Sequence, residues 1–538
     1  MKFKNSIKLS LAAALLSLGA CTGDFYEKNT NPDEATDEML GWDNLRTGSA
    51  FMQLAQNVIP TFQIVGGEEY GSANFQVIQD LAGNIFAGYT GATKSSFKAN
   101  NLYDILAAEW HNAMHDDAFQ RAMGPWAQLD ALREESPEAV ALADVLKVAV
   151  MHRVTDTYGP IAYLSIGNSG IQQEYDSQEV IYNRFFEELD AAITLLTDFC
   201  EKNPSATLLT NYDPIYKGNV RAWVKFANTL RLRLAMRVYY ADPDLSKAQA
   251  EAAINNSVGL MTDASDIAQF AKPATATQWE FPLYMIQYSF NGGDSRIGAT
   301  IESYMNGYED PRRAAYFTQN SKGEYRGVRN GINITADYVL SDLLSSVNCT
   351  NNDAVVWMKP AEAWFLRAEY ELHFGSKAAA GEYYNKGIEC SFSTEGVSGA
   401  ETYMADNVKT QADYQDMVVS SNSASALSDI TIAWDDAADE ETMLERIITQ
   451  KYLAIFPDGQ EAWSEFRRTG YPKIFPNVIN NQSGLISTSK QIRRLNFPST
   501  EYATNASAVQ NAIATLNGES SNPTGDNGGT TLWWDKKN

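Results

Sequence analysis

The chain of 538 residues is 44% hydrophobic and 20% charged, a composition that allows a large buried core and excludes wholesale disorder. Its formal net charge of −25, from 42 Lys and Arg against 67 Asp and Glu, repels phosphate backbones and argues against nucleic acid as a partner. Four Cys and four His are too few for a disulfide framework, a zinc ribbon or a His-rich metal centre, so we expect neither a metal nor a cofactor.

The first 20 residues have the pattern of a bacterial signal peptide. Three Lys within the first eight residues precede an apolar run over 9–18, which is too short to span a bilayer because a spanning helix needs about 20 residues. The run ends in Leu-Gly-Ala-Cys at 18–21, which resembles the lipobox of bacterial lipoproteins. That resemblance implies removal of residues 1–20 and acylation of Cys21; a plain secretory signal with an incidental cysteine is the alternative.

Residues 21–40 are polar and acidic and contain Pro and Asn, which predicts a flexible tether. Asp24 and Glu27 resemble the acidic export signal of surface-exposed lipoproteins, which implies that the protein faces outside. No later segment has the uncharged apolar length of a membrane span, so we expect membrane lipid to hold the chain through Cys21 alone. An odd number of cysteines then remains, and at least one thiol stays free; these are Cys200, Cys349 and Cys390.

Helical patterns dominate the first half of the chain. Ser136 is a suitable cap for a helix that begins with Pro and extends over 137–157. Apolar side chains recur at helical spacing over 220–238, which predicts a second amphipathic helix. On that helix Arg233 and Arg237 are one turn apart, so they could clamp the carboxylates of a neighbouring helix.

Residues 361–390 carry the strongest local pattern, that of a tetratricopeptide unit. Its signature positions are Trp364, Ala368, Gly375, Ala380, Tyr384 and Gly387. We expect the small residues to let two helices pack closely, Gly375 to form the turn, and Trp364 and Tyr384 to fill the seam. No second copy is as clear, although 178–240 and 440–468 have helix–loop–helix character, so the sequence predicts a degenerate solenoid of a few helix pairs.

Eight short sequence motifs, taken in their order along the chain, carry a family resemblance. They are 156–163 (DTYGPIAY), 226–234 (FANTLRLRL), 310–312 (DPR), 359–369 (KPAEAWFLRAE), 450–452 (QKY), 461–472 (EAWSEFRRTGYP), 493–495 (RRL) and 533–536 (WWDK). Together with the lipobox they make the chain similar to the SusD and RagB family of outer-membrane nutrient-binding lipoproteins, specifically its SusD-like subgroup 2. The chain departs from the family at Pro160 and Ala162, where an acid and a proline are expected, and this concerns only the conformation of that loop.

The resemblance implies a mostly α-helical SusD-like fold, here a single domain over 41–538, with tetratricopeptide-like helix pairs that scaffold a loop-rich ligand face. Strand signals in the residues themselves are few and short, as at 325–328, so we expect only minor β pieces. The resemblance also implies that the protein caps a SusC-like TonB-dependent transporter in the outer membrane and captures glycans or other oligomeric nutrients. We expect four arginines of these sequence motifs to bridge packed helices instead of binding ligand. These residues are Arg467, Arg468, Arg493 and Arg494.

No catalytic motif in the sequence supports an enzyme. His111 and His115 are spaced i, i+4 with Asp116 beside them, which could present two metal ligands. Because there is no His-Glu-x-x-His motif and the helix over 109–121 is polar, a solvated helix face is expected instead. Among 67 carboxylates a pair suited to glycoside hydrolysis can always be imagined, and the sequence does not give the separation of such a pair.

A glycan binder needs aromatic rings to stack on the C–H-rich faces of sugars and polar side chains to reach the hydroxyls. Two loop-like stretches fit: 85–92, which is glycine-rich with two aromatics, and 278–291, where aromatics are dense and Pro282 is expected to break any helix. The candidate ligand-binding residues are Phe86, Tyr89, Trp279, Tyr284, Tyr288 and Asn291. The alternative for each aromatic is that it packs in the core or faces the transporter.

The leading hypothesis is therefore a non-enzymatic surface lipoprotein that captures an oligomeric nutrient, foremost a glycan, and delivers it to a SusC-like transporter. One alternative is a lipid-anchored glycoside hydrolase that uses an unrecognised pair of carboxylates. The other is a protein-interaction scaffold, because tetratricopeptide surfaces often bind peptides.

Overall fold

The computed structural model describes residues 44–537 with short gaps at 62, 66–67, 105–107, 168–172, 274–275, 277 and 341. Residues 1–49 and 50–538 form two compact units. The described part of the first is Asn44 and the start of helix α4 (Leu45–Ala55), and all other described elements belong to the second. The predicted signal peptide, tether and Cys21 lie outside the described residues, so they stay predictions, as does the single domain over 41–538.

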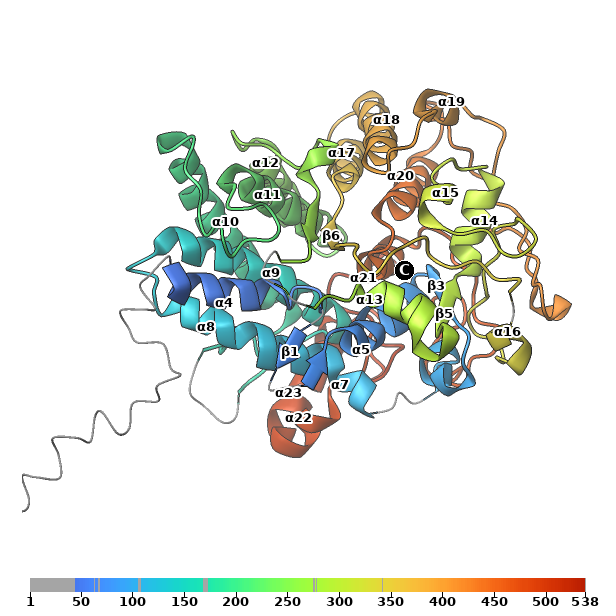
Figure 1. Ribbon diagram of the computed structural model, residues 1–538, viewed down its shortest axis with the longest axis horizontal. Coiled ribbons are helices and arrows are strands. Elements are labelled where there is room, and N and C mark those ends of the chain that lie inside the picture. Colours follow the sequence, from blue (N-terminus) through green and yellow to red (C-terminus); the bar gives the residue numbers. More distant parts are fainter. Residues whose placement is uncertain are drawn as a thin grey trace, which may run out of the picture. The chain divides into compact units, whose positions relative to one another are not determined.

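Helices dominate the second unit, as the sequence predicts (Figure 1). After α4, the α-helices are α5 (Ser72–Phe75), α6 (Lys98–Asn101), α7 (Ala108–Asp117), α8 (Met123–Asp130), α9 (Pro137–Tyr158), α10 (Gln178–Lys202), α11 (Val220–Arg237), α12 (Pro243–Ile254), α13 (Pro282–Tyr284), α14 (Ala299–Gly307), α15 (Arg313–Tyr316), α16 (Ala336–Leu340), α17 (Ala361–Phe374), α18 (Lys377–Thr394), α19 (Ala400–Met404), α20 (Glu440–Ile455), α21 (Gly459–Thr469), α22 (Ser499–Thr504) and α23 (Ala506–Glu519). The π-helical stretches are η2 (Gln76–Asn84), η4 (Ala118–Ala122) and η6 (Met285–Ser289), and the 3₁₀ turns are η3 (Ser95–Phe97), η5 (Ala264–Asp266), η7 (Phe290–Gly292) and η8 (Ser420–Asn422).

Within the described residues, the sheets are short antiparallel pairs of strands. The pairs are β1 (Gln63–Val65) with β2 (Glu68–Tyr70), β3 (Thr90–Ala92) with β5 (Ser295–Ile297), and β4 (Ala268–Phe270) with β6 (Val355–Met358). The strand predicted at 325–328 is wrong, because Val328 makes only an isolated parallel bridge to Gly298. The β3–β5 pair matters most for function, since it holds together two segments that are far apart in the sequence.

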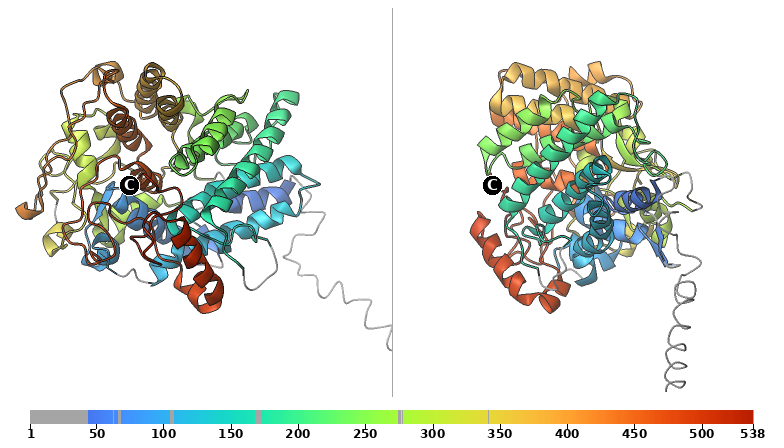
Figure 2. Two further views of the ribbon diagram at one scale, coloured as in Figure 1. Left: turned by 180° about the vertical axis from the view of Figure 1, so that it is seen from behind. Right: turned by 90° about the vertical axis from the view of Figure 1, so that its left-hand side faces the viewer.

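Helix α9 lies at the centre of the second unit, and its predicted extent is confirmed. Every residue from Ala139 to Tyr158 is buried, because α8, α10, α11 and α21 all pack against this helix. Figure 2 shows the unit from behind, with the helix pair α17–α18 at one side and α22 and α23 at the other. The expected cap is wrong: the side chain of Ser136 makes no capping hydrogen bond, and α9 begins on Pro137, whose missing N–H costs nothing at that position.

Residues 361–390 form the expected pair of helices. α17 and α18 pack along each other, and Gly375 lies in the turn between them. A Cβ atom on Gly387 would lie 2.7 Å from the ring of Phe365, so the close approach of the two helices requires glycine at this position. α17 also packs against α11 and α20, which places the pair in contact with the rest of the helical layer.

Both signature aromatics pack between the two helices. Tyr384 of α18 is buried, packs against Phe365 of α17 with ring centroids 6.2 Å apart, and donates its hydroxyl proton to the carbonyl oxygen of Ile432 at 2.6 Å. Trp364 of α17 is half-buried and stacks on Tyr383 of α18, with ring centroids 5.8 Å apart and an interplanar angle of 24°. The expectation that Trp364 and Tyr384 fill the seam is confirmed.

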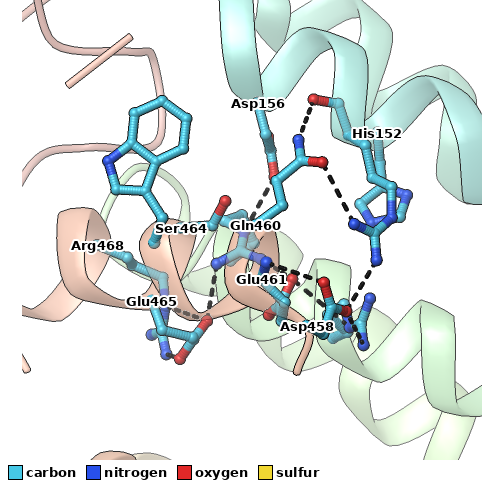
Figure 3. Close-up of polar contacts among 12 residues, drawn as sticks. His152, Asp156, Asp458, Gln460, Glu461, Ser464, Glu465 and Arg468 are labelled. Atoms are coloured by element: carbon cyan, nitrogen blue, oxygen red, sulfur yellow. Dashed lines mark hydrogen bonds and ion pairs between the residues drawn. The ribbon is translucent and has the colours of Figure 1, made fainter. Parts of the chain in front are cut away.

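A buried network of ion pairs joins α9, α11, α17, α20 and α21, and Figure 3 shows the part of it around Asp156, Glu461 and Glu465. Arg233 of α11 donates two hydrogen bonds to the carboxylate of Glu362 on α17, at 2.8 and 2.6 Å. Lys451 of α20 lies 3.5 Å from Glu362, 3.6 Å from Glu461 and 3.5 Å from Glu465. The ammonium group of Lys451 thus lies close to carboxylates from two other helices, α17 and α21.

Arg237 also meets three carboxylates in this network. Its guanidinium donates to Glu461 at 2.5 Å and to Glu465 at 2.7 Å, and its Nε lies 3.3 Å from Asp156 of α9. The predicted clamp of Arg233 and Arg237 on the carboxylates of neighbouring helices is confirmed. Planar guanidinium groups suit this task because they hold carboxylates through paired, directed hydrogen bonds.

The other arginines of the predicted structural set are also buried and paired. Arg468 forms paired hydrogen bonds with Glu369 of α17, at 2.5 and 2.9 Å, and with Glu465. The remaining three contact the C-terminal segment or backbone carbonyls: Arg467 with Asp156 O, Arg493 with Asp535, and Arg494 with Asp526 and Tyr158 O. Their predicted role in bridging packed elements is confirmed.

One carboxyl of the network makes the fold sensitive to acid, whereas burial raises the pKa of another, Asp156. Burial raises the pKa of the Glu461 carboxyl, but the nearby cations Arg237, Arg233 and Lys451 outweigh burial and hold that pKa well below its usual value of 4.5. Because the folded state lowers this pKa, the stabilisation is present above pH 4.5 and is lost as the pH falls below it.

We predict that Arg237→Met destabilises the protein by about 3–5 kcal/mol, because it leaves three buried carboxylates with one cation fewer. The measurement is chemical unfolding of the mature chain at neutral pH. The control is Lys202→Met: Lys202 pairs with Asp198 on the exposed surface of α10, and an exposed pair contributes about 1 kcal/mol or less. Equal losses in the two variants would contradict a structural role for the buried network.

Candidate functional site

The aromatic stretch 278–291 forms a chain of short helical turns. The expectation that Pro282 breaks a helix is wrong. Pro282 begins α13, where proline is favoured because that position needs no N–H. The chain then continues through the π-helical η6 and the 3₁₀ turn η7 into β5. Leu283, Ile286 and Gln287 are buried on the inner side of these turns, so the outer side is free to present other residues.

Two tyrosines lie on that outer side, one helical turn apart. Tyr284 is half-buried and Tyr288 is 38% exposed. Their ring centroids are 5.0 Å apart with an interplanar angle of 30°, so the two rings pack against each other and overlap in part. We call Tyr284, Tyr288 and Asn291 the tyrosine ledge.

Hydrogen bonds to Val347 and Ser295 hold the ledge in place. Tyr288 donates its hydroxyl proton to the carbonyl oxygen of Val347 at 2.6 Å. Gln287 donates to Ser295 Oγ at 2.8 Å and accepts from the N–H of Val347 at 3.2 Å. Partial burial, with Cys349 nearby, raises the pKa of Tyr288, so the hydroxyl stays protonated and the hydrogen bond that orients the ring persists at neutral pH.

The polar end of the ledge joins three segments of the chain. Asn291 adopts a left-handed backbone conformation (φ +49°), and its side-chain amide donates to Asp294 at 2.9 Å. Asp294 also accepts from Gln76 at 2.8 Å, and Lys94 donates to the carbonyl oxygen of Asn291 at 2.8 Å. The β3–β5 pair brings these residues together, and no local pattern in the sequence indicates that Gln76, Lys94 and Asp294 belong to this site.

Trp279 does not belong to the exposed surface. Its side chain is only 8% exposed and lies parallel to Phe270, with centroids 6.2 Å apart and an interplanar angle of 10°. Its indole N–H donates to the carbonyl oxygen of Asp353 at 3.3 Å. The predicted stacking role of Trp279 is wrong for this structure, because one face of the indole covers Phe270 and the ring is almost wholly enclosed.

Phe86 and Tyr89 are also core residues. Phe86 packs against Trp463 with centroids 5.0 Å apart, and Tyr89 packs against Tyr452 at 4.5 Å and donates its hydroxyl proton to the Tyr452 carbonyl oxygen. Both are buried, so the expectation that they stack on a ligand is wrong. The glycines of 85–92 serve close packing: a Cβ atom on Gly88 would lie 2.8 Å from Thr300.

The histidine pair is buried instead of solvated, so the expected exposed helix face is wrong. The ring of His111 lies 3.2 Å from the carbonyl oxygen of Phe497, and both imidazoles pack edge-on against Tyr158. Residues outside α7 therefore cover this face, which the polar sequence of the helix does not reveal.

In the part of the chain that the structure describes, no cluster of three or more His, Cys, Asp or Glu is arranged to hold a metal ion, and Cys200, Cys349 and Cys390 carry free thiols.

Comparisons with known proteins agree with this fold. The sequence profile of the SusD-like family, described as "Susd and RagB outer membrane lipoprotein", matches residues 27–535. No curated protein matches the chain. A chitin-binding SusD homologue from Flavobacterium johnsoniae is 37% identical, with a TM-score of 0.84 over 91% of this chain and 99% of that chain. A SusD homologue from Bacteroides uniformis is 35% identical, with a TM-score of 0.83 over 92% and 100% of the two chains. A third, from Bacteroides thetaiotaomicron, is 35% identical, with a TM-score of 0.80 over 91% and 99%.

We predict that truncating the two kinds of aromatic residue in this segment destabilises the protein to different extents. Trp279→Ala should destabilise the protein by about 3–5 kcal/mol, because transfer and cavity terms add for an enclosed ring. Tyr288→Ala should cost about 1 kcal/mol, since it removes a single hydrogen bond and leaves no cavity. Chemical unfolding of both variants measures the difference, and a Trp279→Ala variant as stable as the wild type would contradict the placement of Trp279 in the core.

Proposed function

Because the chain belongs to the SusD-like family of outer-membrane lipoproteins, we propose that it captures a glycan on the tyrosine ledge and delivers it to a SusC-like TonB-dependent transporter. The observation that carries the proposal is the ledge itself: two adjoining tyrosine rings, one of them 38% exposed, beside polar groups. Sugar rings present C–H-rich faces that stack on such surfaces, while their hydroxyls need amides and charged groups nearby.

The geometry of the ledge favours binding because it is preorganised. The hydroxyl of Tyr288 is already engaged by Val347, and Asn291 is held by Asp294 and Lys94. Little side-chain freedom is left to lose when a ligand docks, so more of the contact energy contributes to affinity. The description of the Flavobacterium relative as chitin-binding supports a glycan as the class of ligand.

The hydrogen bonds of the carboxylate at this site, Asp294, favour binding without catalysis. A glycosidase needs two carboxyl groups that face the sugar about 5–10 Å apart. Asp294, the carboxylate in contact with Asn291, is buried and accepts hydrogen bonds from Asn291 and Gln76. Those bonds give it a structural role, so we assign the ledge to capture and not to hydrolysis.

The same proposal includes the membrane anchor. Cys21 ends a lipobox-like sequence, and an acylated Cys21 followed by the acidic tether over 21–40 would hold the folded chain on the outer face of the outer membrane. In the described part of the chain no helix is long and apolar enough to cross a membrane. Stable attachment takes more than one acyl chain, which is what lipoprotein processing supplies.

We predict that Tyr288→Ala weakens glycan binding by about 2 kcal/mol, or roughly thirtyfold in affinity. The measurement is titration calorimetry of the mature chain against a panel of neutral oligosaccharides that includes chito-oligosaccharides. Tyr288→Phe is the matched control, because it keeps the ring and removes only the hydroxyl; it should bind within about threefold of the wild type. If the alanine variant binds every member of the panel as tightly as the wild type, the ledge is not the capture site.

We predict that Cys21→Ala leaves the fold intact and releases the protein from the membrane fraction. The reason is that acyl chains on Cys21 supply the proposed attachment. Fractionation should be done in cells that lack the partner transporter, since a bound transporter would retain the protein by itself. Retention of the variant in the membrane of such cells would contradict the lipid anchor.

A further inference from the structure

A hollow with a volume of about 530 Å³ lies between α7, α22 and the loops around 482–497 and 526–528. This volume is within the range of about 300–1,000 Å³ that is typical of small-ligand pockets. It shares no residue with the tyrosine ledge. From the features described below we propose that this hollow is a second carbohydrate subsite that takes a neutral pyranose ring, an inference that rests on the proposed glycan-binding function.

The walls of the hollow are apolar and partly open. Leu485 is 47% exposed and Tyr502 is 38% exposed at its rim. Tyr103, Ile492 and Phe497 are buried in its lining. Exposed apolar side chains that converge on a concave surface indicate a ligand site more strongly than scattered ones do.

The carboxylate of Asp526 organises the hollow. It accepts from the guanidinium of Arg494 at 2.5 Å, from the backbone N–H of Phe497 at 2.9 Å and from the hydroxyl of Tyr502 at 2.7 Å. The last bond fixes the ring of Tyr502, just as the bond to Val347 fixes Tyr288 in the ledge. Each hydroxyl is thus held by the protein, and each ring remains partly open to solvent.

The charges in the hollow favour a neutral ligand. Arg494 and Asp526 neutralise each other. Burial lowers the pKa of His111 to about 4, so its imidazole is uncharged at neutral pH, and its Nε2 already contacts the carbonyl oxygen of Phe497. Asp104 at the rim lies 3.9 Å from Lys98 and accepts from Asn481 at 2.7 Å, so the rim carries little net charge, while a sugar hydroxyl can donate to this carboxylate.

One polar amide adds to the complementarity to a sugar. Gln482 lines the hollow, and an amide side chain both donates to and accepts from hydroxyl groups. The amides of Asn496 and Asn527 already donate to the carbonyl oxygens of Asp526 and Thr524. A neutral pyranose ring combines an apolar face with a rim of hydroxyls, which matches a lining in which Leu485 and Tyr502 present apolar surface beside Gln482.

A second subsite would serve capture of a polymer. A glycan chain that occupies one site raises the effective concentration of its other units around the molecule, so the apparent affinity for long chains exceeds that for short ones. Short oligosaccharides, in contrast, should fill the two sites independently.

The test is titration calorimetry with two neutral probes, a short chito-oligosaccharide and a short malto-oligosaccharide, on four forms of the mature chain. These are the wild type, Tyr288→Ala, Tyr502→Ala and the double variant. For at least one probe we expect two molecules bound per wild-type chain, one per single-variant chain and none in the double variant. Tyr502→Phe keeps the ring and should retain both sites, and thermal unfolding of each variant shows that the fold is intact.

The outcomes separate this inference from the proposed function. One molecule per wild-type chain, lost in Tyr288→Ala and unaffected by Tyr502→Ala, overturns the second subsite and leaves the ledge standing. Binding that is unaffected by Tyr288→Ala and is lost in Tyr502→Ala overturns the ledge and supports the hollow. Binding of neither probe to the wild type overturns the second subsite as a site for neutral sugars.

Discussion

The structure depends on burying charge at the junction of five helices. Arg233, Arg237, Arg468 and Lys451 meet the carboxylates of Glu362, Glu369, Glu461, Glu465 and Asp156 inside the protein. Removing charges from water is costly, and the cost is offset only when every partner is in place and well oriented. A shifted or rotated helix would leave a buried charge without its partner, so the network selects one packing of α9, α11, α17, α20 and α21. Hydrophobic contacts alone would discriminate less sharply among alternative packings.

That fixed packing explains how a loop-rich surface can be rigid. α21 packs against η2, and β3, which follows η2 closely in the chain, pairs with β5 at the end of the tyrosine ledge. The ledge is thus tied to the helical core through backbone hydrogen bonds, through Gln287 and through the bond from Tyr288 to Val347. Binding residues on loops work well when a rigid scaffold positions them, and here the scaffold is a packed set of helices.

The sequence predicted the scaffold better than the binding surface, for physical reasons. The spacing of Arg233 and Arg237 showed which residues meet neighbouring helices, and the small residues of 361–390 marked a close helix pair, because both follow from local periodicity. The exposure of Phe86, Tyr89 and Trp279 could not be predicted. Glycine and aromatic residues accompany close core packing as often as open loops, and only tertiary contacts decide between them. The contact of Lys94 with Asn291 joins distant segments and has no local signal.

The central claim is that the preorganised tyrosine ledge captures a glycan while the helical core stays unchanged. Hydrogen–deuterium exchange of the mature chain, with and without a saturating chito-oligosaccharide, tests it most directly. Ligand binding should slow exchange of the amides in 284–297 and around Val347, with little change in α20 and α21, since these helices are already locked by buried ion pairs. Protection confined to the helix pair α17–α18 would instead indicate an interaction scaffold and would contradict the account.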